Sequence, residues 1–429
     1  MDYEKSHERE INIPYGGGHI SAHVDGRRVE WLIDEIEHAP IDFETELRHA
    51  LENPVGSESL SQLITDKKPN SVLILIDDNT RATPQSMILP ILTETLLDLG
   101  VKSENITIMV CLGTHRPLSN RELCERVGKR IYDTFRCLNL SQDSDDFIDY
   151  GVTASGTPIE VSKEYMRYDF KIAVGNIIPH MYAGWAGGAK MVQPGVTSAL
   201  TTARTHLLAA HSINNILGEV ENPIRHEMEE IAVRTGLDFI VNTVIDNFNT
   251  VVAIIAGDVV AAHRSGVAIA KPIFTHEIER RVPIVIAGAH PADRDLWQGF
   301  KPLHNCGLAV EDGGVLILVI EAPEGIAFDH PQLVALGTRP IDDVLHMLSD
   351  HEIKDEVAAA TYMAYRATKD RVAIILVSDG ISEEEALKIG AYSVKTIQEA
   401  INIAEMLVGR DKIGIIPYGA DIIIKVKNA

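Results

Sequence analysis

The feature that most constrains the fold is a unit that recurs along the chain: a continuous apolar run, a few polar residues, and a segment with helical periodicity. SVLILIDD (71–78), followed by QSMILPILTETLLDLG (85–100), is one example. A strand without a polar face must be covered on both sides, and its alternation with helices is typical of parallel sheets. We therefore predict an α/β protein with mostly parallel sheets flanked by helices.

The same apolar strand pattern returns five times, in NITIMVCLG (105–113), DFKIAVG (169–175), VPIVIAG (282–288), GGVLILVIEAPEG (313–325) and RVAIILVSDG (371–380). Near the start, INIPYGGGHISAHV (11–24) alternates apolar and polar residues around glycines, which predicts a β-hairpin. At about 100–200 residues per domain, the chain of 429 residues predicts two lobes. We place them at 1–270 and 271–429.

The charge balance limits the partners. A formal net charge of -23, from 39 basic and 62 acidic residues, opposes binding to nucleic acid or to an anionic membrane. The first residues lack an apolar leader, and no apolar run approaches the roughly 18 residues of a membrane span. Four cysteines without a C-x-x-C pair disfavour a disulfide framework or a zinc ribbon. We expect a cytoplasmic protein with a small-molecule partner.

Functional loops of parallel sheets lie beyond the carboxyl ends of the strands. Four polar segments follow apolar runs in this way, at 77–84, 113–116, 175–195 and 290–304. A single cleft between the two lobes would be lined by such loops from both. We therefore expect the active site in the cleft between the lobes.

The segment GWAGGAK (184–190) combines glycines with a lysine. It is not a P-loop, because Ala189 separates Gly188 from Lys190 and Met191 takes the place of the hydroxyl residue. Glycines let the backbone approach another group closely and expose amides to an anion. Lys190 could neutralise a phosphate or bond covalently to a cofactor. The alternative is a tightly packed turn with a surface lysine.

Several histidines could carry proton or metal chemistry. His115 in GTHR and His180 in IIPHMYAG follow strand ends, and a facing pair could take and return a proton on opposite sides of one carbon. His206 and His211 are five residues apart, so they do not form the zinc pair of an H-E-x-x-H helix. One of them alone could bind a metal if a cofactor supplied the other ligands. A solvated helix histidine is the alternative.

Charged and polar groups at two strand ends could bind a carboxylate. Asp78 and Arg81 lie in DDNTRATP, where an arginine fork suits a carboxylate. Gln298 and Lys301 offer donors next to Trp297 in DLWQGFKPLHN. An ordinary surface salt bridge is the alternative at each place.

These motifs occur in the same order in the nickel-dependent lactate racemase family. The chain resembles this family from PYGGG through DDNTRATP, GTHR, PHMYAGWAGGAK and THLL to WQGFK. The resemblance implies two α/β lobes and a nickel-pincer nucleotide cofactor with Ni(II), made by separate cofactor-synthesis enzymes. It implies inversion of the C2 centre of a 2-hydroxy acid by reversible hydride transfer, as in a racemase or epimerase.

The resemblance also implies roles for individual residues. Lys190 would be the covalent anchor of the cofactor, and His206 would be the metal ligand. His115 and His180 would be the catalytic acid/base pair. The resemblance further implies cofactor contacts from Gly187, Gly188 and Thr80, and substrate contacts from Asp78, Arg81, Trp297, Gln298 and Lys301.

Three residues depart from the family pattern and bear on the substrate. Trp185 and Ala186 stand where phenylalanine and serine are expected, and Trp297 stands where tyrosine is common. These differences allow lactate, a larger 2-hydroxy acid or a sugar acid as substrate.

Two alternatives belong to other functional classes. An NAD-dependent 2-hydroxy acid dehydrogenase would need a G-x-G-x-x-G turn between strand and helix, which the sequence lacks. A non-catalytic carboxylate-binding homologue would have no need for the whole set of histidines and the lysine.

Overall fold

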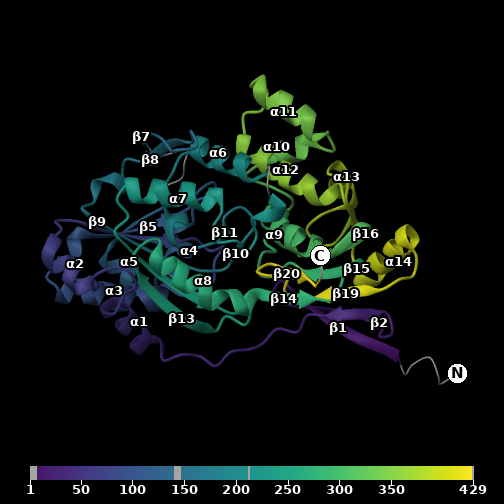
Figure 1. Ribbon diagram of the computed structural model, residues 1–429, viewed down its shortest axis with the longest axis horizontal. Helices are drawn as coiled ribbons and strands as arrows, with labels where there is room; N and C mark the ends of the chain where they lie inside the picture. Colours follow the sequence, from purple (N-terminus) through teal and green to yellow (C-terminus); the bar gives the residue numbers. More distant parts are fainter. Residues whose placement is uncertain (1–6, 140–145, 211–212, 428–429) are drawn as a thin grey trace. The chain divides into compact units, whose positions relative to one another are not determined.

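The computed structural model describes residues 7–139, 146–210 and 213–427, which form two compact units (Figure 1). Unit 1 comprises Met1–Ile36, Ala210–Leu217 and Phe274–Ala429, and unit 2 comprises Glu37–Ala209 and Gly218–Ile273. Each unit contains a six-stranded sheet and its own apolar core. The prediction of an α/β fold with parallel-rich sheets flanked by helices is confirmed.

Unit 2 is built on one large sheet. Its strands are β4 (Val72–Asp77), β5 (Ile106–Cys111), β6 (Arg136–Leu138), β9 (Phe170–Asn176), β12 (Phe239–Ile245) and β13 (Val251–Gly257). Their order is β13-β12-β9-β4-β5-β6, and all neighbours are parallel except β12 and β13. Two small antiparallel pairs are β7 (Phe147–Val152) with β8 (Pro158–Ser162), and β10 (Pro179–His180) with β11 (Gly184–Trp185).

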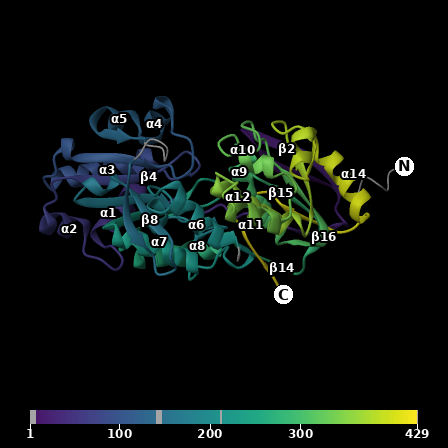
Figure 2. The ribbon, with the colours of Figure 1, turned by 90° about the horizontal axis from the view of Figure 1, so that it is seen from above.

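The helices around this sheet cover both of its faces. They are α1 (Phe43–Glu52), α2 (Leu60–Lys67), α3 (Gln85–Asp98), α4 (Asn120–Val127), α5 (Lys129–Thr134), α6 (Ala199–Ala210), α7 (Pro223–Arg234) and α8 (Ala261–Phe274). Figure 2 shows α4 and α5 on one side of β4, and α7 and α8 on the other.

Strand alternation explains this two-sided covering. Val72, Ile74 and Ile76 of β4 pack with apolar residues of α1 to α5 in one cluster. Neighbouring strand positions point to the opposite face. There the short 3-10 helix η4 (Gly188–Met191) contacts β4, β9, β12 and α7. The segment that carries the candidate lysine therefore lies directly on the sheet.

Unit 1 is built on a second sheet in which all neighbours are parallel. Its strands are β3 (Val29–Leu32), β15 (Val282–Gly288), β16 (Val310–Val319), β17 (Ala373–Val377), β18 (Tyr392–Val394) and β19 (Ile413–Ile416). Their order is β18-β17-β16-β15-β19-β3. The predicted hairpin is present as β1 (Glu8–Tyr15) and β2 (Gly18–Asp25), and β14 (Thr275–Ile278) pairs with β20 (Ile423–Val426).

The helices of unit 1 are α9 (Leu296–Gly307), α10 (Pro331–Leu336), α11 (Ile341–Ser349), α12 (Glu356–Lys369), α13 (Glu383–Lys388) and α14 (Ile397–Val408). One face of the sheet packs with α9, α10 and α12. The other face packs with the hairpin and α14.

The division of the chain differs from the two continuous lobes, 1–270 and 271–429, that the sequence predicts. The crossing at Ile273 and Phe274 is close to the predicted boundary, but Met1–Ile36 and Ala210–Leu217 belong to unit 1. The reason is strand pairing and packing, because β3 extends the unit 1 sheet beside β19 and Ile13 is buried in that unit's core. Contacts between segments so distant in sequence leave no local signal.

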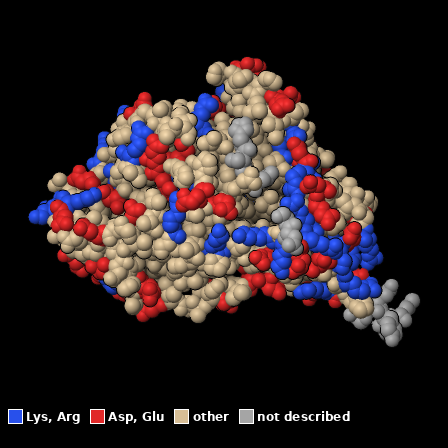
Figure 3. Space-filling model, in the orientation of Figure 1, with Lys and Arg blue, Asp and Glu red and all other residues tan. Residues whose placement is uncertain are grey.

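The surface carries charges of both signs. On the face shown in Figure 3, basic and acidic side chains are interspersed, although acidic residues outnumber basic ones by 62 to 39. No helix within the described ranges is long and apolar enough to cross a membrane.

The β3 and β19 pairing gives a stability prediction. A Cβ atom on Gly414 would lie 2.1 Å from the Trp31 ring, so Gly414→Ala forces the edge strand to shift. We expect a loss of about 1–3 kcal/mol, as in other overpacked cores. Urea unfolding followed by tryptophan fluorescence measures the change. Gly17→Ala is the matched control, since its Cβ would meet no atom within 4 Å, and an equal effect of both substitutions would contradict the prediction.

Candidate active site

The loop after β4 carries three of the predicted site residues and joins them to a fourth, His115. Asp78 Oδ2 lies 2.6 Å from Nδ1 of His115, and Asp78 Oδ1 accepts hydrogen bonds from the amide and hydroxyl of Thr80, at 3.0 and 2.6 Å. Arg81 Nη1 donates to the carbonyl and hydroxyl oxygens of Thr80, at 2.9 and 3.0 Å. The carboxylate therefore orients the His115 ring, while Thr80 orients both the carboxylate and the arginine.

The protonation of this network follows from its charges. Burial disfavours the Asp78 carboxylate, but the His115 ring, the Arg81 charge and the Thr80 hydroxyl outweigh burial and hold the pKa of Asp78 well below its usual range. The ionised carboxylate accepts the Nδ1 proton of His115 in either protonation state of the ring. In the neutral ring Nε2 carries the lone pair, which is the arrangement of a general base.

Sequence reasoning missed the residue that supports this loop. Arg126 in α4 donates to the Asp77 carboxylate, to the Asp77 carbonyl at 3.2 Å and to the Arg81 carbonyl at 2.9 Å. One side chain thereby fixes both ends of the turn that presents Asp78 and Arg81. A helix residue with an ordinary charged-surface pattern gives no signal of this role.

The other two predicted histidines contact a common tyrosine. The amide of Tyr182 donates to Nδ1 of His180 at 3.2 Å, and the ring centroid of Tyr182 lies 6.1 Å from that of His180 and 4.6 Å from that of His206. Because an amide can only donate, neutral His180 carries its proton on Nε2. His211, the other histidine considered for metal binding, lies outside the described residues.

The tautomer of His206 is also fixed by the backbone. Its Nδ1 lies 2.8 Å from the carbonyl of Thr202, one turn earlier in α6, and a carbonyl can only accept. Nε2 therefore carries the lone pair, as required of a histidine that binds a metal. Among the described residues, no group of three or more His, Cys, Asp or Glu side chains is placed to hold a metal ion.

Lys190 lies in η4, on the sheet face opposite to α1 to α5. Burial, reinforced by the charges of Arg81 and Arg225, lowers the pKa of Lys190 to about 7, against the favourable charges of Asp78 and Asp77. The amine is therefore largely neutral just above pH 7. This places Lys190 in the same surroundings as the Asp78 and Arg81 network.

The glycines around Lys190 serve the packing of the loop. Gly187 and Gly188 have φ of +78° and +57°, and an added Cβ would meet Asn176 and His263 respectively within about 3 Å. The Gly188 amide donates to Asn242 Oδ1 at 3.0 Å. These two glycines therefore let the loop backbone pack closely against other parts of the protein.

Two residues expected to shape the substrate pocket are part of the core. The Trp185 side chain is fully buried, and its indole N–H donates to the Gly218 carbonyl at 3.0 Å. Ala186 is 3% exposed, and its carbonyl accepts from Nε2 of His263 at 2.9 Å. Both side chains are therefore packed against the protein, and the wider pocket inferred from these two departures stays a prediction.

The remaining predicted residues lie in unit 1, on α9. Asp295 caps this helix by accepting from the Gln298 amide at 2.7 Å, and Lys301 Nζ donates to Gln298 Oε1 at 2.6 Å. Trp297 stacks on His330 with ring centroids 3.9 Å apart and an interplanar angle of 13°. Trp297, Gln298 and Lys301 are thus one group, while the other nine predicted site residues belong to unit 2.

Two further residues missed by sequence reasoning hold the lysine loop. Asn242 lies in the otherwise apolar strand β12, and Arg225 in α7 donates to the carbonyls of Trp185 and Gly187. Both are fully buried. A polar residue in the middle of an apolar strand could have signalled Asn242, but nothing in the sequence marks Arg225 as buried.

The pKa of Lys190 predicts how a substitution changes stability. Between pH 7 and its ordinary value of 10.5, the unfolded chain binds more protons at this position than the folded chain, so the parent's free energy of unfolding rises with pH. We expect unmodified Lys190→Met to be more stable than unmodified parent below pH 7, with the difference shrinking towards pH 10.

Denaturant unfolding at pH 6, 8 and 10 measures this difference. Lys68→Met, at an exposed lysine of the same unit, is the control and should show no such trend. A difference between parent and Lys190→Met that is constant with pH would contradict the prediction.

Two family models match the chain. The lactate racemase N-terminal domain matches residues 15–218, and the lactate racemase C-terminal domain matches residues 276–424. The first range contains both candidate acid/base histidines, the lysine and the candidate metal ligand. The second range contains the predicted residues of α9.

Full-length relatives and solved structures agree with these models. The lactate racemases of Thermoanaerobacterium thermosaccharolyticum and Lactiplantibacillus plantarum are each 27% identical, over 97% of this chain and 99% of their own length. The structure of the lactate racemase apoprotein from T. thermosaccharolyticum matches with a TM-score of 0.86 at 26% identity, covering 97% of this chain and 100% of that chain. A crystal structure from Thermotoga maritima shares the fold, with a TM-score of 0.71 at 20% identity and coverage of 91% and 100%. The chain belongs to the lactate racemase family of isomerases.

Proposed function

We propose that this chain inverts the C2 centre of a 2-hydroxy acid, with lactate as the first candidate because both relatives are named for it. The observation that carries the proposal is the half-buried Lys190, whose amine lies beside the charges of Arg81 and Asp78 and has its pKa lowered to about 7. Such an amine is a nucleophile at neutral pH and can hold a cofactor covalently. The Asp78 and His115 pair then lies near the group that the lysine would hold.

The proposed cofactor is the nickel-pincer nucleotide, held by Lys190 as covalent anchor and by Nε2 of His206 as metal ligand. The described residues contain no larger cluster of ligand side chains, so His206 would be a single protein ligand and the cofactor would complete the coordination. When bound, the cofactor supplies a hydride acceptor, which no side chain can replace. Gly187, Gly188 and Thr80 have partners within the protein, so we propose that they shape this site.

In this proposal His115 and His180 hold and move the proton of the substrate hydroxyl. Neutral His115 presents a lone pair on Nε2, held in place by Asp78. Neutral His180 carries its proton on Nε2, because Nδ1 accepts from the Tyr182 amide. His115 is thus arranged to accept the hydroxyl proton, whereas His180 would return a proton only as the imidazolium, whose formation breaks the hydrogen bond that Nδ1 accepts from Tyr182.

We propose that Arg81, Gln298 and Lys301 bind the substrate carboxylate. Nη1 of Arg81 is held by Thr80, and no described residue binds its Nε or Nη2, whose fork geometry suits a carboxylate. Lys301 and Gln298 already share a hydrogen bond, which holds both donors together. Trp297, stacked on His330, would contact the rest of the substrate and limit its size.

A racemisation assay tests the two-histidine proposal. Cofactor-loaded protein is incubated with one enantiomer of lactate, and then of larger 2-hydroxy acids, while optical rotation is followed. We expect His115→Ala and His180→Ala each to slow racemisation by about 10²–10⁴-fold, the usual contribution of general acid/base catalysis. His226→Ala is the control, because this exposed histidine binds Glu221 on the surface. Parent rates in both alanine variants would contradict the assignment.

Cofactor loading gives an independent prediction. Protein produced together with the cofactor-synthesis enzymes should contain nickel and a mass increment on the Lys190 peptide, and protein produced without them should contain neither. Peptide mass spectrometry and metal analysis measure both. Active protein with an unmodified Lys190 would contradict the proposal, and 2-hydroxy acid consumption coupled to NADH formation would favour a dehydrogenase.

A location in the cytoplasm, and maturation by the cofactor-synthesis enzymes as the protein partners, belong to the same proposal. They rest on the family resemblance and on the need for a cofactor that this chain does not make.

A further inference from the structure

Arg225 is a buried charge that faces backbone carbonyl groups. Asn222 caps α7 by accepting from the Arg225 amide at 2.9 Å, which sets the direction of the first turn. The guanidinium is fully buried, and it donates through Nη1 to the Gly187 carbonyl at 3.3 Å and through Nη2 to the Trp185 carbonyl. Its Nε is buried with no hydrogen-bond partner among the described residues.

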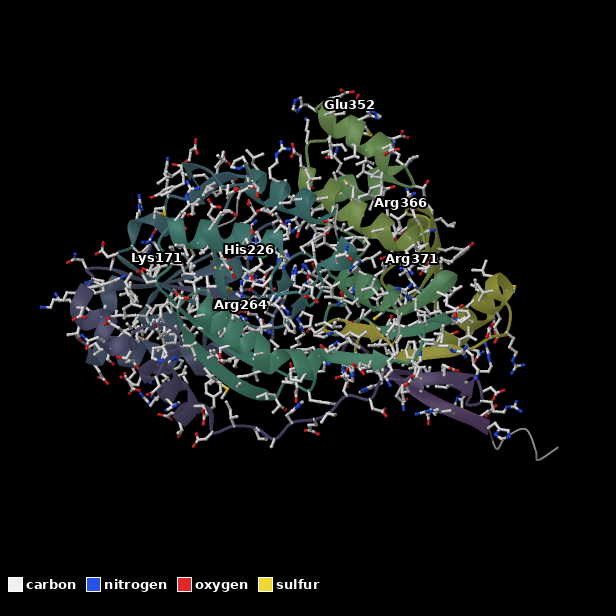
Figure 4. All side chains as sticks on the ribbon, in the orientation of Figure 1. Lys171, His226, Arg264, Glu352, Arg366 and Arg371 are labelled. Carbon is white, nitrogen blue, oxygen red and sulfur yellow. The ribbon has the colours of Figure 1, made fainter. Side chains whose placement is uncertain are left out.

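The carboxylate whose charge acts on Arg225, that of Glu229, is engaged elsewhere. Glu229 binds Arg264 with two hydrogen bonds, at 2.6 and 3.1 Å, and Glu221 binds Arg264 and His226, at 2.6 and 2.9 Å. Figure 4 shows Arg264 and His226 on neighbouring helices, α8 and α7. Arg225 forms no such ion pair with any residue that the structure describes, so its burial is costly and calls for a reason beyond the stability of the fold.

The geometry connects Arg225 to the lysine. The Gly187 carbonyl accepts from Arg225 Nη1 and also from the Lys190 amide, at 3.2 Å. The same oxygen therefore joins the guanidinium to the first turn of η4. The charged and titratable groups that face Lys190 are Asp77 at the end of β4, Asp78 and Arg81 in the loop after it, Cys111 on β5, and Arg225 on α7.

We propose that Arg225 is a positioning residue for Lys190, which clamps the loop from Trp185 to Gly188 and places a positive charge behind the segment that carries the lysine. This inference rests on the proposed function only in taking Lys190 as the cofactor anchor. Removing the Arg225 charge should stabilise the protonated form of Lys190. The Lys190 amine should then be less reactive at neutral pH.

Acetylation of the unmodified protein tests the proposal without nickel or substrate. The Lys190 nitrogen attacks a carbonyl carbon of acetic anhydride, the N–C bond forms, acetate leaves and the ammonium proton passes to water. The initial rate at Lys190 is measured from pH 5 to 11 by peptide mass spectrometry, with the exposed Lys68 as internal reference. The pH midpoint of the Lys190 rate reports the fraction of neutral amine.

Four variants separate the roles of charge and fold. Arg225→Gln and Arg225→Met remove the charge, and Arg225→Lys keeps it. Arg234→Gln is the matched control, because Arg234 lies on the same helix and also donates to two carbonyls, those of Val152 and Tyr150, away from the lysine loop. Circular dichroism establishes that each variant is folded before it is labelled.

We expect a midpoint near pH 7 in the parent, in Arg225→Lys and in Arg234→Gln. In Arg225→Gln and Arg225→Met the midpoint should rise by about one pH unit, which slows labelling at neutral pH by up to about tenfold. A parent midpoint equal to that of Lys68, or neutral variants that follow the parent, would overturn the proposal. So would the failure of both neutral variants to fold, since Arg225 would then be a structural residue. A negative racemisation assay leaves these results unchanged, so the two proposals fail separately.

Discussion

Strand β4 is buried along its whole length, and the candidate site depends on this constraint. A strand that is apolar on both faces needs parallel neighbours and helices on both sides to exclude water. Parallel pairing brings the ends of β4, β5 and β9 to the same edge of the unit 2 sheet. The loops that begin at this edge carry Asp78, His115 and the path to Lys190, so side chains distant in sequence share one environment.

The same environment keeps charged groups where water cannot stabilise them. Lys190 and Arg225 are basic side chains brought together by the packing of η4 against β4, β9 and α7. Charging Lys190 beside Arg225 is unfavourable for folding, and the apolar cluster on the other face of the sheet offsets this cost. Such a loss of folding stability is common at functional sites, where a shifted pKa serves the chemistry of the site.

The sequence predicted the α/β class and most of the strands, because uninterrupted apolar runs have a direct physical meaning. It predicted less well the residues whose role depends on packing. Nothing in the sequence showed that Trp185 is fully buried, or that Arg126 and Arg225 hold the two loops of the site. Both gaps arise because burial depends on which segments meet in space.

What the sequence by itself determined is local: the strand and helix periods, the hairpin at the start, and the side chains that follow each strand. The ordered motifs also led to the family, since they reflect chemistry carried by particular residue types. Only the tertiary structure decided that β3 joins the sheet of unit 1, that His115 and His180 have different tautomers, and that the amine of Lys190 is close to neutral. These properties depend on hydrogen-bond partners and on burial, which long-range packing sets and no short stretch of residues contains.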